Sequence, residues 1–142
     1  MQRDTAFQTY LAVPPHVSSY CTAGTTTNNC VPAIAGIGTP SATGAGSFVI
    51  QASGVEGQKL GLIFYGASGP NHTPLGPGST SFMCVKSPVL RTPVHDSGGV
   101  SGQCNGALSV NWNAYVVSHP VPPPLPGQGF WAQAWFRDPG AV

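Results

Sequence analysis

Residues 130–137 read Phe-Trp-Ala-Gln-Ala-Trp-Phe-Arg and are the most aromatic stretch of this 142-residue chain. In an extended segment, successive side chains point to opposite faces. One face then carries Phe130, Ala132, Ala134 and Phe136, and the other carries Trp131, Gln133, Trp135 and Arg137. An apolar face opposite a face of mixed polarity predicts a β-strand whose apolar side packs on a core.

Two further segments predict long strands. Residues 60–66, Leu-Gly-Leu-Ile-Phe-Tyr-Gly, are almost continuously apolar, which indicates a central strand covered on both faces. Residues 107–113 alternate apolar with small or polar residues, as half-buried antiparallel strands do, and we expect residues 115–117 to extend this strand around a bulge. Shorter strands are expected at residues 31–37, 47–53 and 81–86, with loops at residues 70–77 and 88–104.

The composition favours the same class of fold. The chain has 19 Gly and 15 Pro but only 6% charged residues, so long surface helices are not expected. Its 41% hydrophobic residues argue against disorder. We therefore predict an all-β, antiparallel β-sandwich or jelly-roll-like fold of about six to eight short strands. We expect residues 16–142 to form a single domain, with residues 1–15 before it as an extended arm or linker.

The charge pattern excludes two classes of partner. Five basic and four acidic residues give a net charge of +1, which is no footprint for nucleic acid or for an anionic membrane. No run reaches the roughly 18 apolar residues of a membrane span. The start, Met1-Gln2-Arg3-Asp4, lacks the basic and apolar regions of a signal peptide, so we expect any export signal to lie outside this sequence.

Four cysteines, Cys21, Cys30, Cys84 and Cys104, bear on the compartment. Their number is even and none lies in a C-x-x-C pair, which favours disulfides and an oxidising compartment over zinc or thiol chemistry. The alternative is four reduced cysteines in the core. Among the three possible pairings, local closure favours Cys21 with Cys30 and Cys84 with Cys104, because short segments between turns bring such ends within about 5.5 Å.

The mixed face of residues 130–137 is the best candidate for ligand binding. Trp131 and Trp135, with Gln133 and Arg137 beside them, could form an aromatic platform for sugar rings. Core packing is the competing interpretation of these tryptophans. Other aromatic residues that could join a platform are Tyr65, Trp112 and Tyr115.

One modification motif is also present. The sequon Asn71-His72-Thr73 could carry a glycan at Asn71 in an export pathway that glycosylates proteins.

Catalytic motifs are weak. Asp96-Ser97-Gly98-Gly99 resembles the nucleophile segment of chymotrypsin-type proteases, but no histidine has the matching context, and such folds need a much longer chain. A glycine-rich turn is the favoured interpretation. The histidines are isolated, so His95 beside Asp96 is the best place for a metal site built from distant residues. We predict no catalytic residue, no metal and no cofactor.

Several segments together carry a resemblance to a known family. They are Tyr20-Cys21-Thr22-Ala23, residues 54–58, residues 61–66, Phe82-Met83-Cys84, residues 108–113 and residues 132–139. Their order and the cysteine placement resemble a family of secreted, disulfide-containing β-domains, often C-terminal in larger exported proteins of environmental bacteria. The resemblance covers about residues 20–139. It implies secretion, disulfides and a β-fold, and it implies no ligand or activity.

The chain departs from that family at both ends. In the family, the Arg-Asp-Pro turn leads into one more strand, whereas this chain stops at Val142. A missing strand would leave an open edge, and open edges recruit strands. The N-terminal arm could pair with this open edge as a strand, since alternation puts Phe7, Thr9, Leu11 and Val13 on one side. The arm could pair with its own sheet, enter a neighbour's sheet and build a filament, or remain a disordered linker.

The leading functional hypothesis is a non-catalytic structural or adhesive module, secreted or at the cell surface. Its partners would be further copies of itself, as a homo-oligomer or filament, or an extracellular polysaccharide. Because the surface must be rich in neutral Ser, Thr, Asn and Gly, few like charges oppose association. The alternative is a carbohydrate-binding module that uses Trp131 and Trp135, and a hydrolase is a distant third.

Overall fold

The computed structural model describes residues 3–12, 16–41, 46–78, 80–119 and 129–138, which form eleven strands and one short helix. In chain order the elements are β1 (Arg3–Ala12), β2 (His16–Tyr20), β3 (Ala33–Gly38), β4 (Phe48–Val55), β5 (Leu60–Gly66), β6 (Pro70–Pro74), β7 (Phe82–Val85), β8 (Leu90–Arg91), β9 (His95–Asp96), β10 (Gly106–Asn111), α1 (Trp112–Ser118) and β11 (Phe130–Arg137). The all-β, sandwich-like class is confirmed. More strands appear than expected, partly because residues 88–104 contain the two-residue strands β8 and β9.

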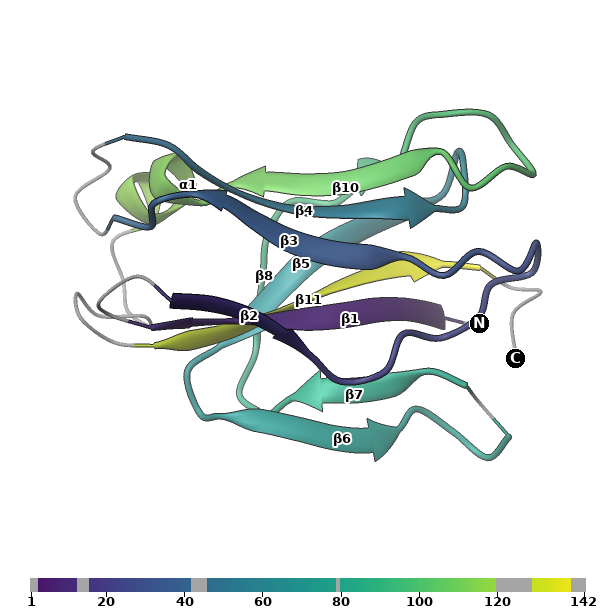
Figure 1. Ribbon diagram of the computed structural model, residues 1–142, viewed down its shortest axis with the longest axis horizontal. Helices are drawn as coiled ribbons and strands as arrows, with labels where there is room; N and C mark the ends of the chain where they lie inside the picture. Colours follow the sequence, from purple (N-terminus) through teal and green to yellow (C-terminus); the bar gives the residue numbers. More distant parts are fainter. Residues whose placement is uncertain (1–2, 13–15, 42–45, 79, 120–128, 139–142) are drawn as a thin grey trace.

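Three antiparallel layers build the molecule (Figure 1). The first sheet has the order β2-β1-β11-β5-β8, and β9 also pairs with β5. The second sheet, β10-β4-β3, packs on one face of the first. The hairpin β6-β7 lies against the other face. The first sheet therefore has a layer packed on each face, and β5 and β11 run through its middle.

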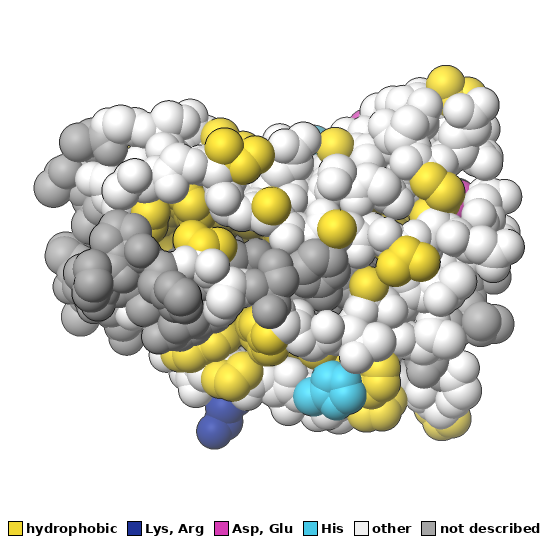
Figure 2. Space-filling view, in the orientation of Figure 1, with side chains coloured by type: hydrophobic (Ala, Val, Ile, Leu, Met, Phe, Trp, Pro, Cys, Tyr) yellow, Lys and Arg dark blue, Asp and Glu magenta, His cyan; other side chains and the backbone are white. Residues whose placement is uncertain are grey.

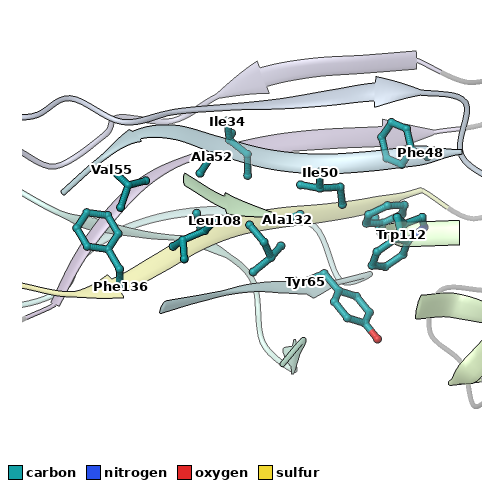
Figure 3. Packing of buried hydrophobic residues seen from close by; sticks show 13 residues of the cluster. Ile34, Phe48, Ile50, Ala52, Val55, Tyr65, Leu108, Trp112, Ala132 and Phe136 are labelled. Carbon is teal, nitrogen blue, oxygen red and sulfur yellow. The ribbon is translucent and has the colours of Figure 1, made fainter. Parts of the chain in front are cut away.

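The main core lies between the two sheets (Figure 3). It contains the predicted apolar face of β11, namely Phe130, Ala132, Ala134 and Phe136. From the second sheet, Phe48, Ile50 and Ala52 of β4 and Leu108 of β10 pack against this face. Each large apolar side chain that is fully buried contributes about 1.5–3 kcal/mol, so this contact holds the sheets together.

Strand β5 is the central strand that its apolar sequence predicts. Every residue from Gly61 to Gly66 is buried. Ile63 and Tyr65 belong to the core between the sheets, whereas Leu62 and Phe64 belong to a second cluster under the hairpin. A Cβ atom at Gly61 would lie 2.6 Å from the carbonyl oxygen of Trp135, so this close strand contact requires glycine.

We expected residues 70–77 to be a loop, but part of this segment forms a strand. Residues 70–74 form β6, which pairs with β7 through Pro70 opposite Val85, Thr73 opposite Met83 and Pro74 opposite Phe82. The two prolines misled the prediction because proline cannot donate to a ladder. An outer hairpin strand tolerates proline, because among the described strands β6 pairs with β7 alone.

Residues 112–118 form the helix α1, so the prediction that residues 107–117 continue as a strand is wrong after Asn111. The side chain of Asn111 accepts a hydrogen bond from the amide of Ala114 and caps the helix. Trp112, Tyr115 and Val116 then pack on the core from positions three and four residues apart. Helical spacing buries these residues better than strand alternation, and this outweighs their β-propensity.

The disulfides are present, but the predicted pairing is wrong. Cys21 bonds to Cys84 and Cys30 bonds to Cys104, at sequence separations of 63 and 74 residues. The Cα atoms lie 6.3 and 5.4 Å apart, within the usual range. The first bridge joins the end of β2 to the outer hairpin, and the second joins the segments that lead into β3 and β10. Sheet order brings these segments together, so short chain separation was the wrong criterion.

The N-terminal segment forms β1 inside the first sheet. It pairs with β11, from Arg3 opposite Arg137 to Leu11 opposite Phe130, and with β2 on its other side. This is the intrachain alternative of the three considered, and the expected domain boundary at residue 15 falls between two neighbouring strands. Phe7, Thr9 and Leu11 lie in β1, whereas Val13 and the two prolines after it lie outside the described residues. Exchange of β1 with a neighbour stays a prediction.

Candidate functional site

Trp131 and Trp135 lie on the face of β11 that looks toward the hairpin. Both are half-buried and pack on the buried cluster of Leu62, Phe64 and Val85. The predicted alternation is therefore present. The hairpin side of this sheet is a layer of apolar contacts and not a bare aromatic surface, because β6 and β7 cover part of it (Figure 1).

Gln133, expected beside the tryptophans as a polar ligand contact, is fully buried. Its Oε1 accepts a hydrogen bond from the amide of Cys84 at 3.1 Å, and its Nε2 donates to the carbonyl of Phe82 at 2.8 Å. Both ends of the amide thus bind the backbone of β7. Gln133 attaches the hairpin to the first sheet, a role that strand alternation alone could not reveal.

A cavity of about 100 Å³ lies between the first sheet and the hairpin. Eight residues line it: Leu62, Phe64, Leu75, Met83, Val89, Arg91, Gln133 and Trp135. Among the predicted platform residues, only Gln133 and Trp135 border this cavity, and Trp131 and Arg137 do not line it. Sequence reasoning missed the others because they come from separate segments that only the fold brings together.

Arg91 is the one charged side chain that lines the cavity. It is exposed, and its guanidinium carbon lies 5.9 Å from the centre of the Trp135 ring, within cation–π range. Among the side chains that the structure describes, one ion pair is present, between Nζ of Lys59 and Oδ1 of Asp138 at 4.0 Å. Arg91 therefore has no carboxylate partner among these described side chains.

Two buried carboxylates, Glu56 and Asp138, lie away from this cavity and hold the loop before Cys30. Oε2 of Glu56 accepts from the hydroxyl of Thr26 at 2.7 Å, and Oε1 accepts from the Asn28 amide group. Asp138 accepts from the amide and hydroxyl of Thr27, at 2.8 and 2.6 Å. These bonds supply the partners that buried charges require, and they make the threonine-rich loop part of the folded structure.

Glu56 also lies beside the disulfide between Cys30 and Cys104. The ligand atoms of these three residues lie within 4.8 Å of one another, a spacing compatible with a metal ion. Zinc needs cysteine as thiolate, and here each sulfur is bonded to the other. The disulfide thus uses the atoms that would have to bind the metal.

The side chains of Ser97 and His95 form hydrogen bonds to backbone groups of neighbouring segments. The Ser97 hydroxyl donates to the carbonyl of Glu56 at 2.7 Å and accepts from the amide of Lys59 at 3.0 Å. The Nε2 atom of His95 accepts from the amide of Ser109 at 3.1 Å, and its Nδ1 lies 3.3 Å from the carbonyl of Pro93. These bonds fit the glycine-rich turn interpretation of this segment.

The sequon lies on the outer hairpin. Asn71 is half-buried in β6, and its Oδ1 accepts from the hydroxyl of Thr73 at 3.0 Å and from the amide of His72 at 2.9 Å. His72 stacks on Phe82 at 4.0 Å between ring centres. Glycosylation of Asn71 stays a prediction.

The remaining aromatic candidates form a cluster at the α1 end of the sandwich. Trp112 is buried and stacks on Phe130 at 4.1 Å between ring centres. The hydroxyl of Tyr65 donates to that of Tyr115 at 3.2 Å. Burial, and next the bond to Tyr115, raise the pKa of Tyr65. Trp112 and Tyr65 are thus part of the core.

These features define an all-β, sandwich-like protein that two long-range disulfides hold together, with a small apolar cavity under an outer hairpin. Comparisons with known protein families, with curated proteins and with solved structures find no match. Within the described ranges, no helix has the length and apolar character needed to cross a membrane.

Proposed function

We propose that this chain is a non-catalytic extracellular module with a structural or adhesive role, secreted or at the cell surface. Two disulfides are typical of extracellular proteins. The resemblance to secreted β-domains supports the same compartment. The low charge of the surface supports the adhesive role and is the observation that carries the proposal.

The longest stretch without charged residues lies in the first part of the chain. Residues 5–55 contain no Asp, Glu, Lys or Arg, so β2, β3 and β4 have no charged side chain. Figure 2 shows a face of neutral polar and hydrophobic side chains, with charged groups only near its margin. Such a surface has little electrostatic repulsion against a second copy.

The two end strands of the second sheet, β10 and β3, differ in how far their edges are protected against pairing with another strand. At β10, the amides of Ala107 and Ser109 donate to the carbonyl of Ser97 and to His95, which covers this edge. At the other end, β3 reads Ala-Ile-Ala-Gly-Ile-Gly and has neither charge nor proline. It contacts β1 and β2, but Ile37 remains 57% exposed. Natural edge strands usually have charges that prevent pairing, so β3 is the proposed place where copies associate.

Sedimentation velocity of the disulfide-bonded chain at rising concentration tests this proposal. We expect reversible self-association that 1 M salt does not weaken, because few charges take part. Ile37→Lys should weaken association about tenfold, since it puts a charge on an exposed position of the end strand β3. Val100→Lys, an equally polar change at an exposed loop residue, serves as the control and should have little effect.

Other outcomes decide against parts of the proposal. A chain that remains monomeric at millimolar concentration contradicts self-adhesion, and equal effects of both lysine variants contradict the role of β3. Loss of association only when residues 1–13 are removed supports a filament made by exchange of β1 instead.

A carbohydrate-binding module that uses Trp131 and Trp135 stays the alternative, because both rings are only half-buried on the hairpin face of β11. A glycan panel tests it, with loss of binding in Trp135→Ala as the expected sign.

A further inference from the structure

We propose that the cavity beside Trp135 binds a small monocarboxylic acid with an apolar body of about five carbon atoms, and that Arg91 pairs with its carboxylate. This inference goes beyond the proposed function, because it concerns a small ligand and needs no second copy of the chain. An apolar cavity of about 150 Å³ in another protein holds the six carbon atoms of benzene. The cavity here is smaller, about 100 Å³, and is open on one side, so it suits a body of about five carbon atoms whose carboxylate stays outside.

The lining determines the chemistry of the ligand's body. Five of the eight lining residues are aliphatic or aromatic without a polar atom other than sulfur: Leu62, Phe64, Leu75, Met83 and Val89. The amide of Gln133 already binds the backbone of β7 at both ends. The hydroxyls of a sugar would find few partners on these walls, and burying them without partners is unfavourable. A hydrocarbon body has no hydrogen-bonding groups, so its burial against these walls leaves no polar group without a partner.

Arg91 determines the chemistry of the ligand's polar end. It borders the cavity and is exposed, so it stands where the cavity meets solvent. The side chains that the structure describes provide no carboxylate for it. A guanidinium presents parallel N–H donors that match a carboxylate. A ligand with its apolar body against Trp135 and its carboxylate toward solvent would supply the missing anion.

The walls of the cavity are held in place before any ligand arrives. Gln133 attaches β7 to β11, which positions Met83 on one side. On the other side, Arg91 of β8 pairs with Phe64 of β5. Small-molecule sites are usually preformed in this way, with apolar walls and a few placed polar groups.

The test is a titration of the full, disulfide-bonded chain with 4-methylpentanoate, followed by the indole N–H resonance of Trp135. We expect saturable binding in roughly the millimolar range, because so small a ligand makes few contacts. The neutral 4-methylpentanamide should bind about three- to tenfold more weakly, the effect of losing a partly exposed charge pair. Acetate, which has the charge without the body, should give no saturable shift at equal concentration.

Matched variants locate the site. Arg91→Gln should weaken binding of 4-methylpentanoate about three- to tenfold and should leave binding of the amide unchanged. Arg137→Gln removes an exposed arginine from the same strand as Trp135 but not from the cavity, and it should bind like the parent chain. Leu75→Trp should fill the cavity and abolish binding, and Met83→Phe is the second filling variant if the first does not fold.

Three results would overturn the proposal. They are the absence of a saturable shift at Trp135, equal affinity for acid and amide, and equal effects of Arg91→Gln and Arg137→Gln. Glycan binding that is lost in Trp135→Ala while 4-methylpentanoate does not bind would favour the carbohydrate alternative. Failure of self-association leaves these readouts unaffected, so the two proposals can fail separately.

Discussion

Two tyrosines, the half-buried Tyr20 and the buried Tyr65, show how single residues connect the layers. The hydroxyl of Tyr20, at the end of β2, donates to the carbonyl of Cys84 in the hairpin at 2.7 Å. The hydroxyl of Tyr65 donates to Tyr115 beside α1. Burial raises the pKa of Tyr20, and burial together with the bond to Tyr115 raises the pKa of Tyr65. Both phenols must therefore stay protonated for the native contacts to persist.

This predicts a loss of stability in alkali. The unfolded chain releases these protons near the ordinary tyrosine pKa of about 10, while the native chain keeps them. Above about pH 10 the unfolded state thus binds fewer protons, so the free energy of unfolding falls as pH rises. Urea unfolding at pH 8, 10 and 11 should show a steeper fall for the parent chain than for a Tyr20→Phe, Tyr65→Phe double variant. Parallel pH profiles would count against this account.

At the scale of elements, α1 depends on one exposed side chain. Asn111 ends β10 opposite Val49 and also caps α1 through the amide of Ala114, at 3.3 Å. The cap determines where the strand stops and the helix starts. Because α1 brings Trp112 into the core, the cap supports one end of the sandwich.

Asn111→Ala should lower the free energy of unfolding by about 1 kcal/mol, the usual cost of a lost cap. Asn111→Asp keeps a side-chain acceptor and should retain most of the stability. Equilibrium urea unfolding measures both variants. Equal destabilisation by alanine and aspartate would mean that the cap bond is not what matters at this position.

At the scale of the whole molecule, the disulfides link distant parts of the chain. One attaches the outer hairpin to the end of β2, and the other joins the segments before β3 and β10. Both close long loops. Long loops lose more freedom in the unfolded state when they are closed, so these bridges stabilise more than the local pairing would have.

A non-reduced digest should yield peptides that link Cys21 to Cys84 and Cys30 to Cys104. Replacing Cys30 and Cys104 together by alanine should lower the free energy of unfolding by about 4 kcal/mol, from the entropy of a loop of this size. Urea unfolding of the double variant checks the magnitude. A linked peptide of Cys21 with Cys30 would contradict the connectivity.

Much of the fold could be predicted because strand patterns are local. Alternation in residues 130–137 indicated which side chains of β11 face the core, and the apolar run at residues 60–66 indicated a strand buried on both sides. The scarcity of charge and the many glycines and prolines pointed to an all-β class. Each of these signals depends on neighbours in the chain, which the sequence contains in full.

Other features depend on which segments meet in space, and a single sequence does not state this. Sheet order places Cys21 beside Cys84, and pairing with β7 turns a proline-containing segment into β6. The hairpin then buries Gln133, and the cavity collects Arg91 and Trp135 from β8 and β11. The sequence by itself determined the class of fold and the core faces, because these follow from local periodicity. Only the tertiary structure decided the disulfide pairing and the candidate site, because both depend on distances between segments far apart in the chain.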